Sequence, residues 1–124
     1  MTNEPLMTVV TSHVGPVAVL TVDGDVDLHT APQLLDAADA ALQPSGDPPV
    51  DSVVADLTRA AFLSSAGLGT LVSLAGRLGE NGVALRLVAG QNRAVTRPWT
   101  AMHLGDLLPL YPDLPAALQA GTAG

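Results

Sequence analysis

The sequence contains no cysteine and no lysine. Without cysteine the chain can form no disulfide, no thiol nucleophile and no thiolate metal site. Its five basic residues are all arginines and stand against 12 acidic residues, so the net charge at pH 7 is −7. An acidic chain without lysine lacks the positive surface that binds nucleic acid or an anionic membrane. We therefore expect neither nucleic acid nor a membrane as a partner.

Long hydrophobic runs are missing as well. No apolar stretch approaches the ~18 residues that a membrane-spanning helix needs. The first ten residues contain no basic segment followed by an apolar run, which argues against a signal peptide. The three histidines, His13, His29 and His103, lie too far apart in the sequence for a metal-binding spacing. The sequence therefore predicts a soluble cytoplasmic protein that holds no metal ion.

What the chain does contain fits one globular domain. It has 124 residues, of which 48% are hydrophobic. That length supports one modest core and not two. We expect a single domain over residues 1–124, with a core over about residues 8–120 and flexible tails at both ends.

Short β-branched runs alternate along the chain with amphipathic segments of helical period. The runs predict strands at Thr8–Ser12, Val17–Val22, Ser52–Leu57, Val83–Val88 and Leu107–Tyr111. The amphipathic segments predict helices over Thr30–Leu42 and Ser65–Leu78, a short or kinked helix after Asn92 and a short helix after Asp113. Strand–helix–strand units imply parallel pairs, and an initial hairpin-like pair makes the sheet mixed. The expected fold class is α/β: a mixed sheet of four or five strands, with Ser52–Leu57 central, and about four helices.

Local signals predict where these elements begin and end. Thr30-x-x-Gln33 matches a capping box at a helix start. The turn dipeptide Asp23-Gly24 should end its strand, and Gly79 and Gly82 should end the second long helix. Loops are expected over Gln43–Asp51 and Thr58–Leu63, and a frayed tail over Ala120–Gly124.

Packing does not explain two segments, Gly24–Thr30 and Phe62–Gly69. Both lie at a strand-to-helix junction, where open α/β sheets usually place their sites. In the second segment, Ser64 and Ser65 open a helix whose first amides have no intrahelical partner. A serine here can simply cap the helix. It can also be a phosphoacceptor, because the positive end of a helix tolerates a phosphate. Capping does not explain the glycines packed around the serines.

Catalytic interpretations of these segments have less support. Gly67-Leu68-Gly69 lacks the third glycine of a dinucleotide fingerprint, and no lysine completes a P-loop. Ser65, His29 and Asp27 supply the residue types of a hydrolase triad, but no oxyanion motif accompanies them. Asp25 and Asp27 could form an acid–base pair or a Mg²⁺ site, although aspartates after a glycine more often form a solvated turn.

Taken together, these motifs resemble the STAS domain, in particular the stand-alone bacterial anti-sigma factor antagonists. Gly24–Thr30 (GDVDLHT) is similar to the family pattern Gly-x-Leu/Val-Asp-x-x-Thr. Asp56-Leu57, Phe62 and Ser64–Gly69 (SSAGLG) are similar to Asp-Leu, an aromatic residue and Asp-Ser-Ser/Thr/Ala-Gly-Leu-Gly. Asn92–Arg97 resembles the third helix of the family. The resemblance spans nearly the whole chain.

The resemblance implies a partner-switching protein and not an enzyme. Unphosphorylated antagonists bind an anti-sigma factor, usually a GHKL-type serine kinase, and so free a sigma factor. The kinase phosphorylates one serine, and a serine phosphatase reverses the reaction. Carried over to this sequence, that serine is Ser65, with Ser64 as the alternative acceptor, and Asp27 is the acidic residue beside it. ATP would belong to the kinase, so we expect no cofactor here.

The expected contact surface lies at one end of the sheet. It comprises Asp25, Asp27, His29, Thr30, Phe62, Ser64, Ser65, Ala66, Gly67, Leu68, Asn92 and Arg93. The chain departs from the family at one position, because the aspartate before the phosphoacceptor is Ser64 here. Serine keeps the capping function and loses the negative charge, which lowers the expected efficiency of phosphorylation. The alternative function is therefore a phosphorylation-independent binding or scaffold subunit with a STAS fold, for example of a transport complex.

Overall fold

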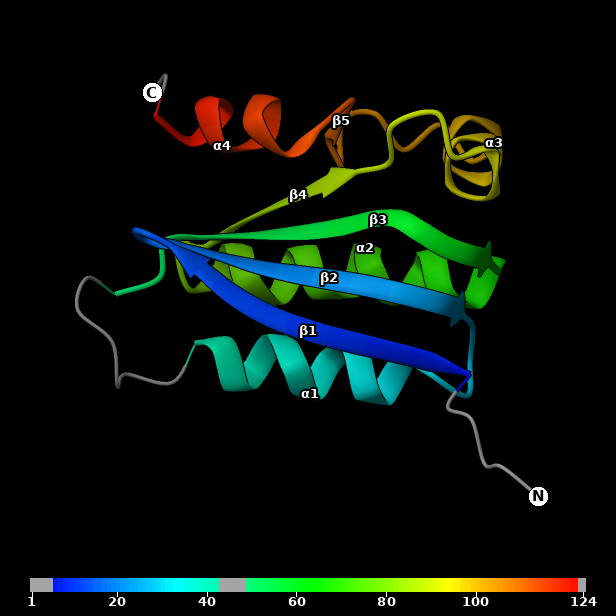
Figure 1. The fold of residues 1–124 in the computed structure, drawn as a ribbon, viewed down its shortest axis with the longest axis horizontal. Helices are drawn as coiled ribbons and strands as arrows, with labels where there is room; N and C mark the ends of the chain where they lie inside the picture. The colour runs from blue at the N-terminus through cyan, green and yellow to red at the C-terminus, as the bar shows by residue number, and fades with distance from the viewer. Residues whose placement is uncertain (1–5, 43–48, 123–124) are drawn as a thin grey trace.

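The computed structural model describes residues 6–42 and 49–122 of the chain. Within these residues a five-stranded sheet forms, with neighbouring strands in the order β1-β2-β3-β4-β5. The strands are β1 (Met7–Val14), β2 (Val17–Val26), β3 (Ser52–Leu63), β4 (Ala84–Val88) and β5 (Leu110–Tyr111). β1 runs antiparallel to β2, and the other neighbours are parallel. The predicted mixed sheet with Ser52–Leu57 in its central strand is confirmed (Figure 1).

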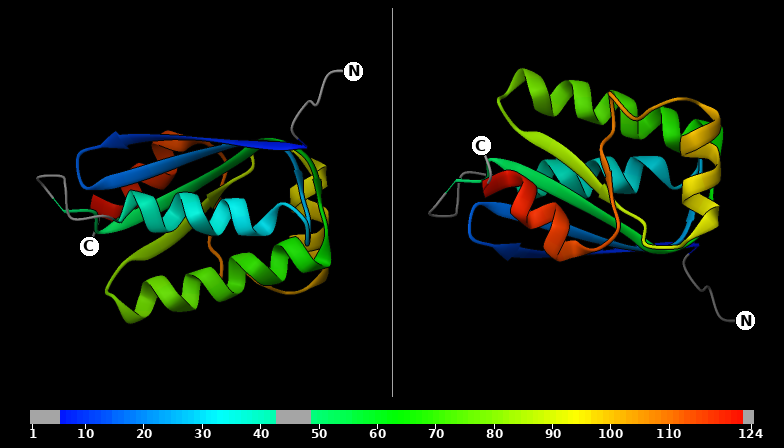
Figure 2. Two further views of the ribbon diagram at one scale, coloured as in Figure 1. Left: turned by 90° about the horizontal axis from the view of Figure 1, so that it is seen from below. Right: turned by 90° about the horizontal axis from the view of Figure 1, so that it is seen from above.

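Helices cover both faces of the sheet. Those in the described part of the chain are α1 (Ala31–Ala41), α2 (Ser65–Glu80), α3 (Arg93–Ala101) and α4 (Leu114–Thr122). α1 and α2 lie on one face and α4 on the other, while α3 crosses one end (Figure 2). The larger core, which includes Leu20, Leu34 and Leu71, lies beneath α1 and α2. The smaller core joins Ala117 of α4 to valines of the opposite sheet face. The α/β fold class is confirmed.

β2 and β3 are longer than the sequence predicts. The prediction that Asp23-Gly24 ends its strand is wrong, and so is the prediction of a loop over Thr58–Leu63. Both strands continue because their second halves pair with one another, with two irregularities in the register. Gly24 has a φ of +107°, and the Leu6 carbonyl packs where its side chain would be. Only glycine fits such a position, so Gly24 serves a strand irregularity and not a chain reversal.

The ends of two helices differ in detail from the prediction. Thr30 is the N-cap of α1 as predicted, but the capping box is wrong, because the Thr30 side chain makes no capping hydrogen bond. The Gln33 side chain instead donates from Nε2 to the Met7 carbonyl on β1, at 3.3 Å. α2 continues through the exposed, helical Gly79 to Glu80. The chain leaves this helix only at Gly82, whose φ of +73° is the left-handed conformation that glycine adopts without strain.

The C-terminal helix also extends further than predicted. α4 reaches Thr122, so the frayed tail expected over Ala120–Gly124 is wrong for its first three residues, and residues 123–124 lie outside the described part. Most of the predicted loop over Gln43–Asp51 and the first five residues lie outside it too. The predicted cap is confirmed, since the Asp113 carboxylate accepts from the Ala116 N–H at 2.9 Å.

α3 is short, as expected of a helix that contains Pro98, and spans nine residues. Asn92 caps it: its side-chain oxygen accepts from the Ala94 N–H at 3.1 Å. The predicted N-cap is therefore confirmed. α3 packs against β3 and α2 and lies at the end of the sheet where β2 and β3 finish (Figure 1).

Candidate functional site

The two segments singled out from the sequence lie side by side. The carboxyl ends of β2 and β3 meet at one end of the molecule, where α1 and α2 also begin (Figure 1). The Ser64 N–H donates to the Val26 carbonyl at 3.0 Å, and Asp25 lies in register with Phe62. Parallel pairing of β2 with β3 is the reason, because it brings both strand-to-helix junctions to one edge.

The two adjacent serines have different roles at the start of α2. The Ser64 Oγ accepts from the Gly67 N–H at 3.0 Å, and the Ser64 backbone is extended with φ −79° and ψ 166°. These are the features of an N-cap. Ser65 is the first helical residue, and its side chain is exposed. The structure therefore identifies Ser64 as the cap and leaves the Ser65 hydroxyl accessible.

The start of α2 is held tightly against the end of β2. Gly67 is buried, and its α-carbon packs on the Val26 carbonyl, the group that also accepts from Ser64. Leu68, in the next position, is fully buried in the main core. Together these contacts fix the position of the first turn of α2, and therefore of the exposed Ser65, relative to the end of β2.

The turn between β2 and α1 is organised by Asp27 and Thr30. The Asp27 Oδ1 accepts from the backbone N–H groups of His29 (2.9 Å) and Thr30 (3.1 Å). The buried Thr30 hydroxyl donates to the Asp25 carbonyl at 2.8 Å and accepts from the Asp27 N–H at 3.0 Å. This network explains both residues as turn-forming groups, and Asp27 does not use its carboxylate to orient the His29 imidazole.

Asn92 connects α3 to β3. Besides capping α3, its side chain donates from Nδ2 to the Leu57 carbonyl at 2.9 Å and to the Ala60 carbonyl at 2.8 Å. Leu57 and Ala60 both face the main core although they are three positions apart, whereas a regular strand returns to the same face every second residue, so β3 is irregular between them. The Asn92 amide supplies the donors that these carbonyls need. Asn92 is therefore a positioning residue for this end of the sheet.

Large apolar side chains stand exposed at the end of the sheet that carries Ser65. Phe62 is 50% exposed, Leu28 70% and Leu6 63%. The Leu6 carbonyl accepts from the Asp25 N–H at 2.9 Å, and Phe62 is the β3 neighbour of Asp25, so Leu6 and Phe62 flank the same residue. The sequence prediction included Phe62 but missed Leu6 and Leu28. For Leu28, the signal in the sequence was an apolar residue inside a predicted turn. Whether such a residue is exposed depends on contacts between distant segments, which the sequence does not give.

Three residues of the predicted contact surface are buried. Thr30 is 6% exposed, Leu68 is 0% exposed, and Gly67 is buried. They hold the site from beneath and do not offer their side chains to a partner. His29, Phe62, Ser65, Ala66 and Arg93 are exposed, and Asp25, Asp27, Ser64 and Asn92 are partly buried.

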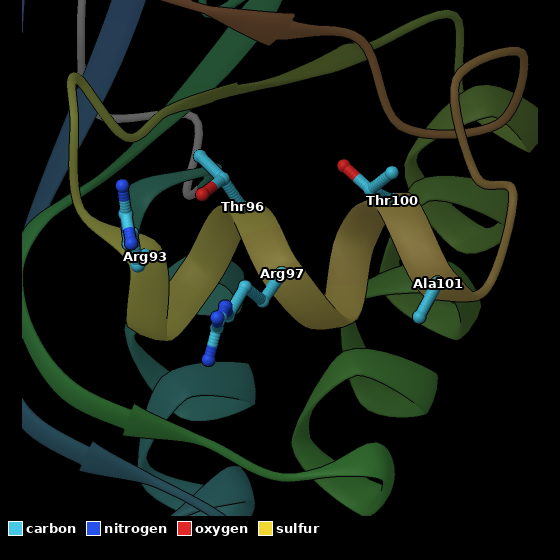
Figure 3. A pocket seen from close by; sticks show the side chains of 5 residues that line it. All are labelled: Arg93, Thr96, Arg97, Thr100 and Ala101. Atoms are coloured by element: carbon cyan, nitrogen blue, oxygen red, sulfur yellow. The ribbon is translucent and has the colours of Figure 1, made fainter.

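A shallow pocket of about 430 Å³ lies on the outer side of α3 (Figure 3). Arg93, Thr96, Arg97, Thr100 and Ala101 line it, so all its walls come from successive turns of one helix. Two of the five arginines in an acidic chain are therefore gathered beside the serine end of the sheet.

The geometry does not favour a hydrolase. Among the described residues, the side chains of Ser65 and His29 form no hydrogen bond with one another, and the Asp27 carboxylate binds backbone amides. In the same residues, no group of three or more histidine or acidic side chains is placed to hold a metal ion. None of the helices over residues 6–42 and 49–122 has the length and apolar character that a membrane crossing needs.

Comparison with known proteins gives a consistent result. The family model described as STAS domain matches residues 8–117. An anti-sigma factor antagonist from Mycobacterium paratuberculosis is 34% identical, with 92% of each chain covered and a TM-score of 0.78. A putative anti-sigma factor antagonist from Thermotoga maritima is 18% identical, with 90% of this chain and 92% of that chain covered and a TM-score of 0.77.

The anti-sigma factor antagonist SpoIIAA of Bacillus, in its unphosphorylated form, is 15% identical, with 94% of this chain and 98% of that chain covered and a TM-score of 0.72. No protein with a curated description matches the chain. At such low identity SpoIIAA and the Thermotoga protein support the fold alone. The family match contains both strand-to-helix junctions, and the mycobacterial relative shares a third of its residues over nearly the full length. The chain therefore belongs to the STAS domain family.

Proposed function

We propose that this chain is an anti-sigma factor antagonist that binds an anti-sigma factor and thereby releases a sigma factor. The 34% identical relative over 92% of both chains is an anti-sigma factor antagonist, which supports this assignment. The proposal places the chain in the cytoplasm, beside the transcription machinery. It assigns the chain a binding role and no catalytic one.

We further propose that phosphorylation of Ser65 switches this binding. The proposal depends on one observation: Ser64 is engaged as the N-cap, whereas Ser65 stands exposed on the first turn of α2. A kinase can reach the Ser65 hydroxyl without breaking the cap. A phosphate there would meet the positive end of a 16-residue helix, so the fold should tolerate it.

The contact surface would surround Ser65. Exposed Phe62 and Leu28 offer apolar anchors, and such side chains often dominate the energy of an interface. Arg93 and Arg97 add positive charge on α3, which lies at the same end of the sheet (Figure 1). A partner that packs on this surface would bury the Ser65 hydroxyl, and a phosphate would place about two negative charges in that contact. The partner would be a serine kinase of the GHKL type, with a serine phosphatase reversing its action.

One residue supports the second candidate, a binding or scaffold subunit without a phosphorylation switch. Ser64 replaces the aspartate that the family carries before its phosphoacceptor, so this helix start lacks the usual carboxylate. Under this alternative the same surface would bind its partner constitutively. The two candidates make opposite predictions for modification of Ser65.

Calorimetry with the cognate anti-sigma factor, captured from the native cell, tests the switch. We expect Ser65→Ala to bind like the wild type, and Ser65→Glu to bind more than a hundredfold more weakly, because an uncompensated buried charge costs several kcal/mol. Ser73→Glu is the matched control, since Ser73 is an exposed serine on the same helix. A kinase assay should label the wild type and not Ser65→Ala. Equal binding by wild type and Ser65→Glu, with no label on either, would favour the constitutive scaffold.

A further inference from the structure

A different surface, the outer edge of β1, is open. In both views of Figure 2 β1 forms a border of the molecule, and no strand of the described chain pairs with its outer side. β1 is eight residues long and pairs with β2 without a bulge. An open edge strand presents unpaired N–H and C=O groups to which another strand can add.

The hydrogen bonds identify which groups of β1 face outward. The Leu6 carbonyl accepts from Asp25 on β2, so the backbone groups of Leu6 face β2. The backbone groups of Met7 face the outer edge, because its carbonyl accepts from the Gln33 side chain and not from β2, while its side chain is buried in the main core. The backbone N–H and C=O groups of successive residues in a strand face opposite edges, so those of Val9, Thr11 and His13 also face outward. Gln33 covers the edge at Met7. Within residues 6–42 and 49–122, the outward backbone groups of Val9, Thr11 and His13 have no strand beside them, and Thr11 lies at the centre of this open ladder.

The usual defences of an edge strand are missing from β1. It contains no proline and no acidic, lysine or arginine residue, and its one titratable side chain is His13. Val10 is 64% exposed and Val14 is 48% exposed. Both lie on the sheet face that carries α4, but outside the core cluster beneath that helix. The chain as a whole carries a charge of −7, but none of its acidic residues lies on β1. β1 itself therefore presents no like charge to a second copy of β1.

We propose that two copies of this chain pair antiparallel through β1, about a two-fold axis at Thr11, to form a continuous ten-stranded sheet. Thr11 would face Thr11 of the partner subunit, and Val9 would face His13 of the partner subunit. The outward backbone groups of all three residues would then form hydrogen bonds in both subunits. With the axis at Val10, His13 of the partner subunit would instead face Met7, whose carbonyl already accepts from Gln33. The self-complementary ladder is the reason that the occupant is a second copy, as in two-fold symmetric interfaces generally. Ser65 lies at the end of the sheet and not at this edge, so the inference does not rest on the proposed function.

Single cysteines test the register, because the chain has none of its own. Residues facing each other in a hydrogen-bonded antiparallel pair have Cα atoms about 5.5 Å apart, within the reach of a disulfide. Thr11→Cys should therefore cross-link to its symmetry mate under mild oxidation, about tenfold faster than Thr8→Cys. Thr8 is the matched control, since it is exposed on the same strand but would face Val14 of the partner subunit. Equal cross-linking of the two variants would overturn the proposal.

Analytical ultracentrifugation of the full chain at about 100 µM gives an independent test, since edge contacts of this size are weak. We expect the wild type to sediment at twice the mass of the 12.6-kDa chain. Thr11→Pro removes an outward N–H and should give monomers, as should Val10→Lys, which places two like charges near the axis. Leu107→Lys, at an exposed apolar residue away from β1, should remain dimeric. A monomeric wild type, larger aggregates, or a folded Thr11→Pro that is still a dimer would each refute the pairing.

Discussion

The α-carbon of Gly67 packs directly on the backbone carbonyl of Val26. A Cβ on Gly67 would lie 2.5 Å from the Val26 oxygen, closer than real Cβ contacts come. The same oxygen accepts from the Ser64 N–H at 3.0 Å. One carbonyl at the end of β2 therefore fixes both the cap and the first turn of α2, and hence the place of Ser65.

Gly67→Ala should destabilise the fold by about 1–3 kcal/mol, because backbone atoms would have to shift, and Gly67→Val should cost more. Urea denaturation measures the difference. Gly76→Ala is the control, since a Cβ there meets no atom within 4 Å, and it should be neutral or stabilising by up to about 1 kcal/mol. Equal stability of Gly67→Ala and wild type would contradict the close approach.

Asn92→Asp should separate the two roles of Asn92. Aspartate keeps the oxygen that caps α3 but loses the donors to the Leu57 and Ala60 carbonyls. We expect a loss of about 1–3 kcal/mol in the free energy of unfolding, since both carbonyls lose the Asn92 donor and would face a carboxylate instead. Asn81→Asp removes an exposed donor to the Arg77 carbonyl and should cost less than about 0.5 kcal/mol. If both variants lose the same small amount, Asn92 acts as a cap alone.

Ser64→Ala should cost about 1 kcal/mol, because the Gly67 N–H loses its side-chain acceptor. Ser64→Asp should keep the cap and add charge at the positive end of α2, so its stability should equal or exceed that of the wild type. It also restores the family pattern and should speed phosphorylation of Ser65 without blocking binding. Melting curves and a radiolabelled kinase assay are the measurements. Label that disappears in Ser64→Ala but persists in Ser65→Ala would make Ser64 the acceptor.

Phe62→Ala and Leu28→Ala should each weaken binding to the anti-sigma factor about tenfold or more, because exposed apolar side chains around Ser65 would be anchors of the interface. Neither variant should change the melting temperature strongly, since both side chains are at least half exposed. Val14→Ala is the control, as Val14 is 48% exposed at the opposite end of β1. Equal affinities of all three variants and the wild type, measured by calorimetry, would place the interface elsewhere.

Local patterns were enough to predict the order of elements in this fold. Alternating β-branched runs and helical stripes predicted β1, α1, α2 and the central β3, and the caps Asn92 and Asp113 were recognised as single residues. These features succeed because they depend on neighbours in the sequence. The same reliance on sequence neighbours gave a wrong prediction at Asp23-Gly24. This dipeptide is typical of a turn, but here it continues β2 alongside β3.

What the sequence alone determined is the α/β order and the meeting of two strand-to-helix junctions at one sheet edge, since parallel strands finish on the same side. It left open which adjacent serine caps α2 and which apolar residues stay exposed. Only the tertiary structure decided these points, because they depend on where distant backbone segments meet. The Val26 carbonyl fixes the backbone of Ser64, which turns its side chain to the Gly67 amide and leaves Ser65 outside. The point where the open edge of β1 begins is likewise set by Gln33, which reaches Met7 across 26 positions of sequence.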